Sequence, residues 1–209
     1  IVFGDWSSDV CSSDLTTALQ IGDLHFETWY SPMFDDNQKM TGVIGVAADI
    51  TDRVAQERLR QLNENRLEAM LQLYTLSSSS VQEICDYALE QAVRITESEI
   101  GYLAFLNQDE SILHMYSWSK TAMQQCQVGD IEREYPVCLT GLWGEAVRQR
   151  KPIITNDYTL PNPHKKGYPE GHVPIHRHLN LPVFENNHIV AVVGVGNKIR
   201  DYDENDIRQ

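Results

Sequence analysis

The chain has 209 residues, 42% of them hydrophobic, and a formal net charge of −13. This length allows one large domain or two small ones. The acidic charge argues against nucleic acid and an anionic membrane surface, because phosphate binding needs clustered Lys and Arg. The longest apolar run, residues 189–193, is too short to span a bilayer. The four cysteines are irregularly spaced and no signal peptide is visible. We therefore expect a cytoplasmic module. A membrane anchor elsewhere in the parent protein is compatible with this expectation.

Residues 1–15, IVFGDWSSDVCSSDL, have neither a helical nor a strand period. The part from residue 9 to residue 15 matches the translation of a common short-read sequencing adapter. We therefore expect residues 1–15 to be non-native and exclude Trp6 and Cys11 from functional reasoning; the alternative is a Ser/Asp-rich loop. The sequence also stops soon after a helix start, so we expect a fragment at both ends.

Residues 24–34 and 42–50 are predicted strands that flank the polar turn 35–39. The sequence Asp-Ile-Thr follows at 49–51, and then a charged helix begins. Strand, polar turn, strand, Asp-Ile-Thr and helix resembles the end of a PAS domain, over residues 16–51. That resemblance implies that the PAS ligand-binding core lies upstream. A hairpin alone is marginally stable, so we expect this part to be poorly packed.

Residues 52–76 are predicted to form one long helix, because the stretch contains neither Gly nor Pro. Its apolar residues fit a heptad, with an interruption at Arg66; they are Ala55, Leu59, Leu62, Ala69, Leu73 and Leu76. We expect a parallel coiled-coil linker between two sensor modules, and hence a homodimer. The alternative is an amphipathic helix that packs on its own domain.

Downstream, Ser80 and Glu83 form the capping box of a helix whose apolar stripe includes Cys85. Strands are predicted at 100–106 and 112–118, followed by an irregular segment at 119–130 and a short extended piece at 131–137. A helix at 141–149 precedes a strand at 153–156. A hairpin at 179–184 and 188–196 comes after a long loop, and a final helix begins near Tyr202. This order predicts an α+β fold with an antiparallel sheet flanked by helices.

With GLWGEAVRQRKPIITND and LPVFENNHIVAVVGVGNK in place, the second module resembles a GAF domain. The resemblance covers residues 67–209, and we place the domain at 77–209. A PAS end, a helix and a GAF domain together resemble the input half of microbial sensor histidine kinases. The sequence contains no kinase motif, so we expect this part not to be an enzyme. GAF domains are regulatory ligand binders, and the fold alone does not identify the ligand.

The loop at residues 157–178 holds four of the seven histidines and is predicted to be an ordered lid over a pocket. Cys126 lies in the irregular segment that borders the ligand cavity in GAF domains, and His172 follows 46 residues later (172 − 126). Met123 lies in the same segment as Cys126. Aromatic side chains are expected to wall the pocket; they are Tyr102, Tyr116, Trp118, Tyr158 and Tyr168.

The lid sequence GYPEGHVP, together with Cys126, resembles a GAF subgroup of microbial redox-sensing kinases. The resemblance implies haem, attached through Cys126 and ligated by His172 as the axial ligand. Haem needs an apolar slot and an axial His or Cys. The usual attachment motif C-x-x-C-H is absent.

Other functions remain open from the residues alone. His172, His176 and His178 could hold zinc with Cys126 or Cys138, or could cap loop carbonyls. Cys126 and Cys138 could be the nucleophile and resolving pair of a GAF-type thiol reductase. The domain could also be a dimer scaffold without a ligand, in which Cys126 is a half-buried apolar residue.

Overall fold

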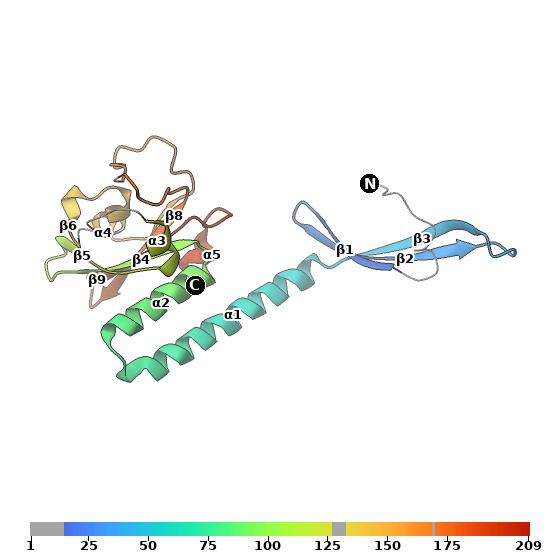
Figure 1. Ribbon diagram of the computed structural model, residues 1–209, viewed down its shortest axis with the longest axis horizontal. Helices are drawn as coiled ribbons and strands as arrows, with labels where there is room; N and C mark the ends of the chain where they lie inside the picture. The colour runs from blue at the N-terminus through green and yellow to red at the C-terminus, as the bar shows by residue number, and fades with distance from the viewer. Residues whose placement is uncertain (1–14, 127–132, 169) are drawn as a thin grey trace. The chain divides into compact units, whose positions relative to one another are not determined.

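The computed structural model describes residues 15–126, 133–168 and 170–209 (Figure 1). The chain divides into two compact units, residues 1–63 and 64–209. Within the described residues, no helix is both long and apolar enough to cross a membrane.

The first unit contains a three-stranded antiparallel sheet in the order β1–β2–β3. Its strands are β1 (Leu15–Ile21), β2 (Leu24–Phe34) and β3 (Met40–Asp49). The hairpin β2–β3 is the predicted one. Strand β1 was not predicted; it begins at Leu15, which pairs with Tyr30. Residues 1–14 of the predicted non-native segment lie outside the described residues.

Both faces of this sheet carry exposed apolar side chains. Leu19 and Val43 are exposed on one face, and Trp29 and Val46 on the other. Thr28 is the only buried residue among the described residues of the three strands. The sheet therefore has little core of its own.

The sequence Asp-Ile-Thr starts the helix α1 (Thr51–Thr75). The Asp49 carboxylate accepts hydrogen bonds from the Thr51 backbone N–H at 2.9 Å and the Thr51 hydroxyl at 2.6 Å. The Thr51 oxygen accepts in turn from the backbone N–H of His25 at 2.9 Å. These bonds hold the pKa of Asp49 below its ordinary value and fix the turn between β3 and α1.

Helix α1 has two apolar faces along its second half. Ala69 is buried and Leu73 is half-buried, as is Leu76 in the turn after the helix, whereas the heptad positions Ala55 and Leu59 are exposed. Glu68 forms an ion pair with Arg94 of the next helix at 3.8 Å. The later part of the predicted heptad thus packs on its own domain, and the coiled-coil linker stays a prediction. The other face has four exposed side chains at spacings of three and four: Leu67, Met70, Leu71 and Tyr74.

The second unit is built on a six-stranded antiparallel sheet in the order β6-β5-β4-β9-β8-β7. Its strands are β4 (Ile100–Leu106), β5 (Ile112–Trp118), β6 (Glu134–Pro136), β7 (Ile153–Thr155), β8 (His178–Glu185) and β9 (His188–Gly196). The predicted α+β class is confirmed. Strands β8 and β9 form the predicted hairpin, with Asn186 and Asn187 at positive φ in its turn.

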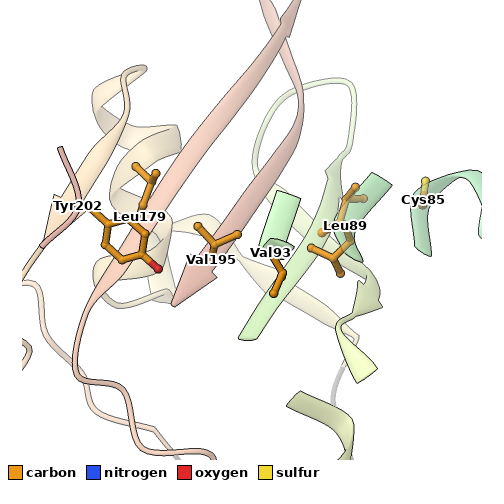
Figure 2. Close-up of a cluster of buried hydrophobic side chains, with 7 residues drawn as sticks. Cys85, Leu89, Val93, Leu179, Val195 and Tyr202 are labelled. Atoms are coloured by element: carbon orange, nitrogen blue, oxygen red, sulfur yellow. The ribbon is translucent and has the colours of Figure 1, made fainter. Parts of the chain in front are cut away.

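Helix α2 (Val81–Ile95) covers one face of this sheet. It follows the short 3₁₀ turn η1 (Leu76–Ser78), and the predicted capping box of Ser80 and Glu83 is present. The core between α2 and the sheet (Figure 2) is formed by Cys85, Leu89, Val93, Leu103, Leu179, Val195 and Tyr202. Cys85 is thus a core residue.

The opposite face carries short helices and the long loop. The segment predicted to be irregular contains α3 (Lys120–Gln125), because Ser119 caps a helix by accepting from the Ala122 N–H. Residues 127–132 lie outside the described part of the chain. The predicted helix at 141–149 consists of a 3₁₀ turn, η3 (Leu142–Gly144), followed by a short α-helix, α4 (Glu145–Gln149). Another 3₁₀ turn, η2 (Val137–Leu139), precedes them.

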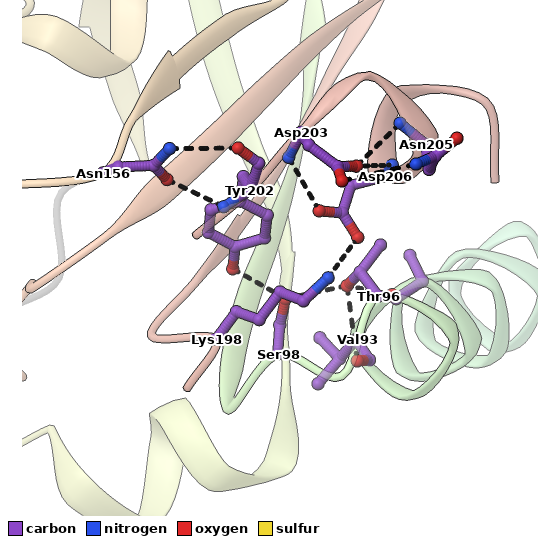
Figure 3. A network of polar contacts seen from close by, with 10 residues as sticks. Val93, Thr96, Ser98, Asn156, Lys198, Tyr202, Asp203, Asn205 and Asp206 are labelled. Atoms are coloured by element: carbon purple, nitrogen blue, oxygen red, sulfur yellow. Dashed lines mark hydrogen bonds and ion pairs between the residues drawn. The ribbon is translucent and has the colours of Figure 1, made fainter. Parts of the chain in front are cut away.

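The chain ends in α5 (Glu204–Ile207), which is tied to the domain by polar contacts (Figure 3). Asp206 is buried and forms an ion pair with Lys198 at 2.5 Å. The Tyr202 hydroxyl lies 2.7 Å from that of Ser98, which follows the end of α2. Both the N–H and the C=O of Tyr202 bond to the side chain of Asn156, at 2.8 and 3.0 Å.

Candidate functional site

A cavity of about 530 Å³ lies on the sheet face opposite α2. Its volume is within the range of small-molecule and cofactor sites. Most lining side chains are apolar or aromatic. They come from the sheet, from α3 and η3, and from the loop before β8: Ile100, Tyr102, Met115, Trp118, Ala122, Met123, Cys126, Tyr135, Trp143, Tyr158, Tyr168, His172, Val173, Ile175, His178, Asn180 and Val195, with Gly101, Gly167, Gly194 and Gly196.

The structure brings most of the predicted site residues together around this cavity. Cys126 and His172 both line it, as do the predicted Met123 and four of the five predicted aromatic residues: Tyr102, Trp118, Tyr158 and Tyr168. Cys126 packs with Ile100, Ala122 and Val173. The long loop therefore does border a cavity.

Tyr116 does not line the cavity, and its expected place in the wall is wrong. A β-bulge lies between β4 and β5, where Leu103 pairs with Ser117 and Ala104 pairs with Met115. Tyr116 is the extra residue, so the strict alternation that would place it beside Trp118 is broken. Its ring packs against Phe105 in the α2-side core, at a centroid distance of 4.9 Å.

The bulge brings Met115 to the cavity instead, which sequence reasoning missed. Trp143 also lines the cavity, where it packs edge-on against Tyr102 and Tyr135. Asn180 was not singled out. The signal that marks Asn180 is a polar residue inside a strand predicted to be buried.

His172 is held by two contacts. Its Nδ1 lies 2.7 Å from the backbone oxygen of Val173, and its ring stacks on Tyr168 at 5.0 Å. A carbonyl oxygen can only accept, so Nδ1 carries the proton in the neutral ring. The Nε2 lone pair is therefore free for a ligand, as in most metal-bound histidines.

The zinc and reductase alternatives need residues that the structure does not gather. Within the described part of the chain, no three His, Cys, Asp or Glu side chains converge in a way that could hold a metal. His176 is exposed on the loop. Cys138 is exposed on η2 and is not among the cavity-lining residues, unlike Cys126.

His178 was predicted to end the loop, but it is the first residue of β8, where it pairs with Thr155 and Gly196. It is 8% exposed, and burial lowers its pKa to about 4, so the ring is neutral at pH 7. Its Nδ1 lies 2.9 Å from the amide nitrogen of Asn180.

Asn180 is in turn bound by Tyr102, whose hydroxyl donates to Asn180 Oδ1 at 2.8 Å. Burial raises the pKa of Tyr102, which keeps its hydroxyl protonated. These two residues lie on β4 and β8 and both pair with Gly194 of the strand between them. A Cβ at Gly194 would lie 2.1 Å from the Tyr102 ring, so glycine allows the bond across β9.

Comparison with known proteins agrees with this architecture. The GAF domain family model matches residues 78–209. The Methyl sulfide methyltransferase-associated sensor of Methanosarcina acetivorans is 56% identical over 167 residues, which are 80% of this chain. The chain spans only 17% of the length of that relative.

Solved structures share the fold at low sequence identity. The GAF domain of a phosphoenolpyruvate-protein phosphotransferase from Coxiella burnetii superposes with a TM-score of 0.55 at 16% identity, over 69% of this chain and 85% of the other. The free methionine-R-sulfoxide reductase of Neisseria meningitidis, in complex with its substrate, gives 0.51 at 11% identity, over 71% and 82%. With the family model covering more than half of its residues, the chain belongs to the GAF domain family.

Proposed function

We propose that residues 64–209 are the ligand-binding input module of a sensory protein, and that the cavity holds haem. Cys126 is the proposed point of covalent attachment, and His172 the proposed axial ligand. The observation that supports this most is that both residues, from separate segments, line one apolar and aromatic cavity. The relative that is named a sensor supports the sensory role.

The residues present suit haem in two respects. The aromatic walls favour a flat, apolar ring. The Nδ1 contact of His172 to Val173 leaves Nε2 free to ligate iron. When bound, haem would supply an iron centre whose ligation responds to redox state or to a small molecule.

Cys126 would attach the group without any oxidant. Its S–H would add across a vinyl double bond of the group, with sulfur bonding to one carbon and hydrogen to the other. His172 keeps its orientation through Val173 and through stacking on Tyr168. The protein thus contributes attachment, orientation and a cavity lined mainly by apolar groups.

We propose that ligand binding changes the conformation at the start of the loop at 157–178. Tyr158 lines the cavity, and its N–H donates to the His176 carbonyl at 2.8 Å. Asn156, two residues before Tyr158, forms two hydrogen bonds through its side chain with the backbone of Tyr202, just before α5. A shift of the loop on ligand binding would therefore also move the segment before α5. The populations of two packing arrangements of α5 on the domain would then change.

We further propose that the parent protein is a sensor histidine kinase, that residues 16–51 end a PAS domain, and that the chain works as a homodimer. The order of strands and helix supports the PAS assignment. The exposed stripe of Leu67, Met70, Leu71 and Tyr74 on α1 is the proposed contact with a second copy.

The test of haem binding uses the whole chain, expressed with a haem precursor. Purified protein is expected to show a Soret band that survives acid–acetone extraction. Cys126→Ala should keep the band but lose it on extraction, and His172→Ala should change its position. Cys138→Ala and His176→Ala are matched controls, because both residues are exposed and outside the cavity lining. Absence of a Soret band in the wild-type protein would refute the haem proposal.

A further inference from the structure

The cavity has a second polar feature besides Cys126 and His172. His178 is fixed at the start of β8 by pairing with strands on both sides. It is more than nine-tenths buried, and it lines the cavity. Its position is therefore set by the sheet, whereas that of His172 is set by the loop.

The proton on the His178 ring can be located from its neighbours. Tyr102 donates to Asn180 Oδ1, so the other end of that amide is the NH₂ group. This NH₂ group donates to His178 Nδ1, which is therefore an acceptor. A neutral imidazole has one N–H, and here it must be on Nε2.

The Nε2–H of His178 has no hydrogen-bond partner among the described residues. A buried donor without a partner costs free energy, and such groups in native proteins call for an explanation. The Tyr102 hydroxyl donates to Asn180 Oδ1, and the Asn180 NH₂ group donates to His178 Nδ1. Neither residue therefore accepts a hydrogen bond from His178 Nε2–H. An acceptor supplied by a ligand would remove the cost.

We propose that His178 is a ligand contact of the cavity, and that its Nε2–H donates a hydrogen bond to a small uncharged acceptor that binds there. This rests on the proposed haem function, with the acceptor being a diatomic molecule at the iron. The His178 donor is a neutral imidazole, which suits an uncharged acceptor.

Carbon monoxide is the probe, applied to the reduced, haem-loaded chain. Replacing His178 by Gln keeps an amide N–H near the position of Nε2, whereas Asn reaches only the position of Nδ1. The C–O stretching band of His178→Gln should stay near that of the wild type. In His178→Asn and His178→Leu the band should move to higher wavenumber, and carbon monoxide should dissociate roughly three- to tenfold faster. Asn180→Leu should broaden or split the band, because Asn180 positions the ring. His176→Leu is the control and should change nothing.

The outcomes separate the two proposals. If no Soret band forms, the haem proposal fails, and this one fails with it. If the Soret band forms but the C–O band is the same in all His178 variants, only the hydrogen bond is refuted. If His178→Leu changes the number of iron ligands in the ferric spectrum, His178 is itself a ligand and its role as a donor is wrong.

Discussion

Tyr102 and Asn180 are joined by a hydrogen bond of 2.8 Å that passes over Gly194. The bond links β4 to β8 across β9, and it sets the amide that holds His178 Nδ1. Because each partner comes from a different strand, the polar end of the cavity depends on the sheet register, and Gly194 leaves the room it needs.

Gly194→Ala should therefore lower the stability of the domain and disrupt the hydrogen bonds that join Tyr102, Asn180 and His178. Its Cβ would lie 2.1 Å from Tyr102 Cε1 and 2.6 Å from Asn180 Oδ1, so the Tyr102 ring must move. We expect a loss of about 1–3 kcal/mol in the free energy of unfolding, measured with urea. Gly42→Ala is the control, since a Cβ there meets no atom within 4 Å. Equal stability of the two variants would contradict the role of Gly194.

The buried His178 should make stability depend on pH. Its pKa is about 4 in the folded state and about 6.5 when unfolded, so the unfolded chain binds more protons between these values. Stability should fall as pH is lowered from about 6.5 towards 4, by roughly 3 kcal/mol at most.

Urea unfolding of the wild type and His178→Gln at pH 7.5, 6 and 5 measures this loss. The variant lacks the titrating group, so its stability should decline less over the same range. Parallel declines would show that His178 is not the group responsible.

Breaking the buried ion pair of Lys198 and Asp206 should loosen α5. Asp206 is 1% exposed, and Lys198→Met would leave its carboxylate buried without a cation (Figure 3). We expect a loss of about 3–5 kcal/mol, either globally or as local opening of the C-terminal segment in hydrogen exchange. The double variant Lys198→Met/Asp206→Leu should recover most of it. Failure of the double variant to recover would mean that the Lys198 side chain acts through packing, for example on Tyr202.

The exposed stripe on α1 should control association. Leu67→Glu/Leu71→Glu is expected to shift the chain from dimer to monomer in sedimentation velocity, with unchanged urea stability of the second unit, because both side chains are exposed. Gln72→Glu, at an exposed position outside the stripe, adds a charge without removing apolar surface and should leave association unchanged. A wild type that is monomeric at high concentration would contradict the proposed dimer.

The sequence by itself determined the order of the strands and of the long helix in the second unit, and it missed the short helix α3. Periodicity placed β4, β5 and β9 because buried strands carry a strong apolar signal, and the capping box placed the start of α2. The resemblance to GAF domains then selected Cys126 and His172, and the structure places both at one cavity.

Only the tertiary structure decided which face of the sheet or helix a side chain lies on where the regular alternation of apolar residues is broken. One extra residue in β5 turned Tyr116 to the core and Met115 to the cavity, and local sequence carries no sign of that bulge. The heptad on α1 could not say which apolar face packs inside the domain and which stays exposed. The chain Tyr102–Asn180–His178 is equally hidden, because its members come from two strands separated by β9, and long-range pairing alone brings them together.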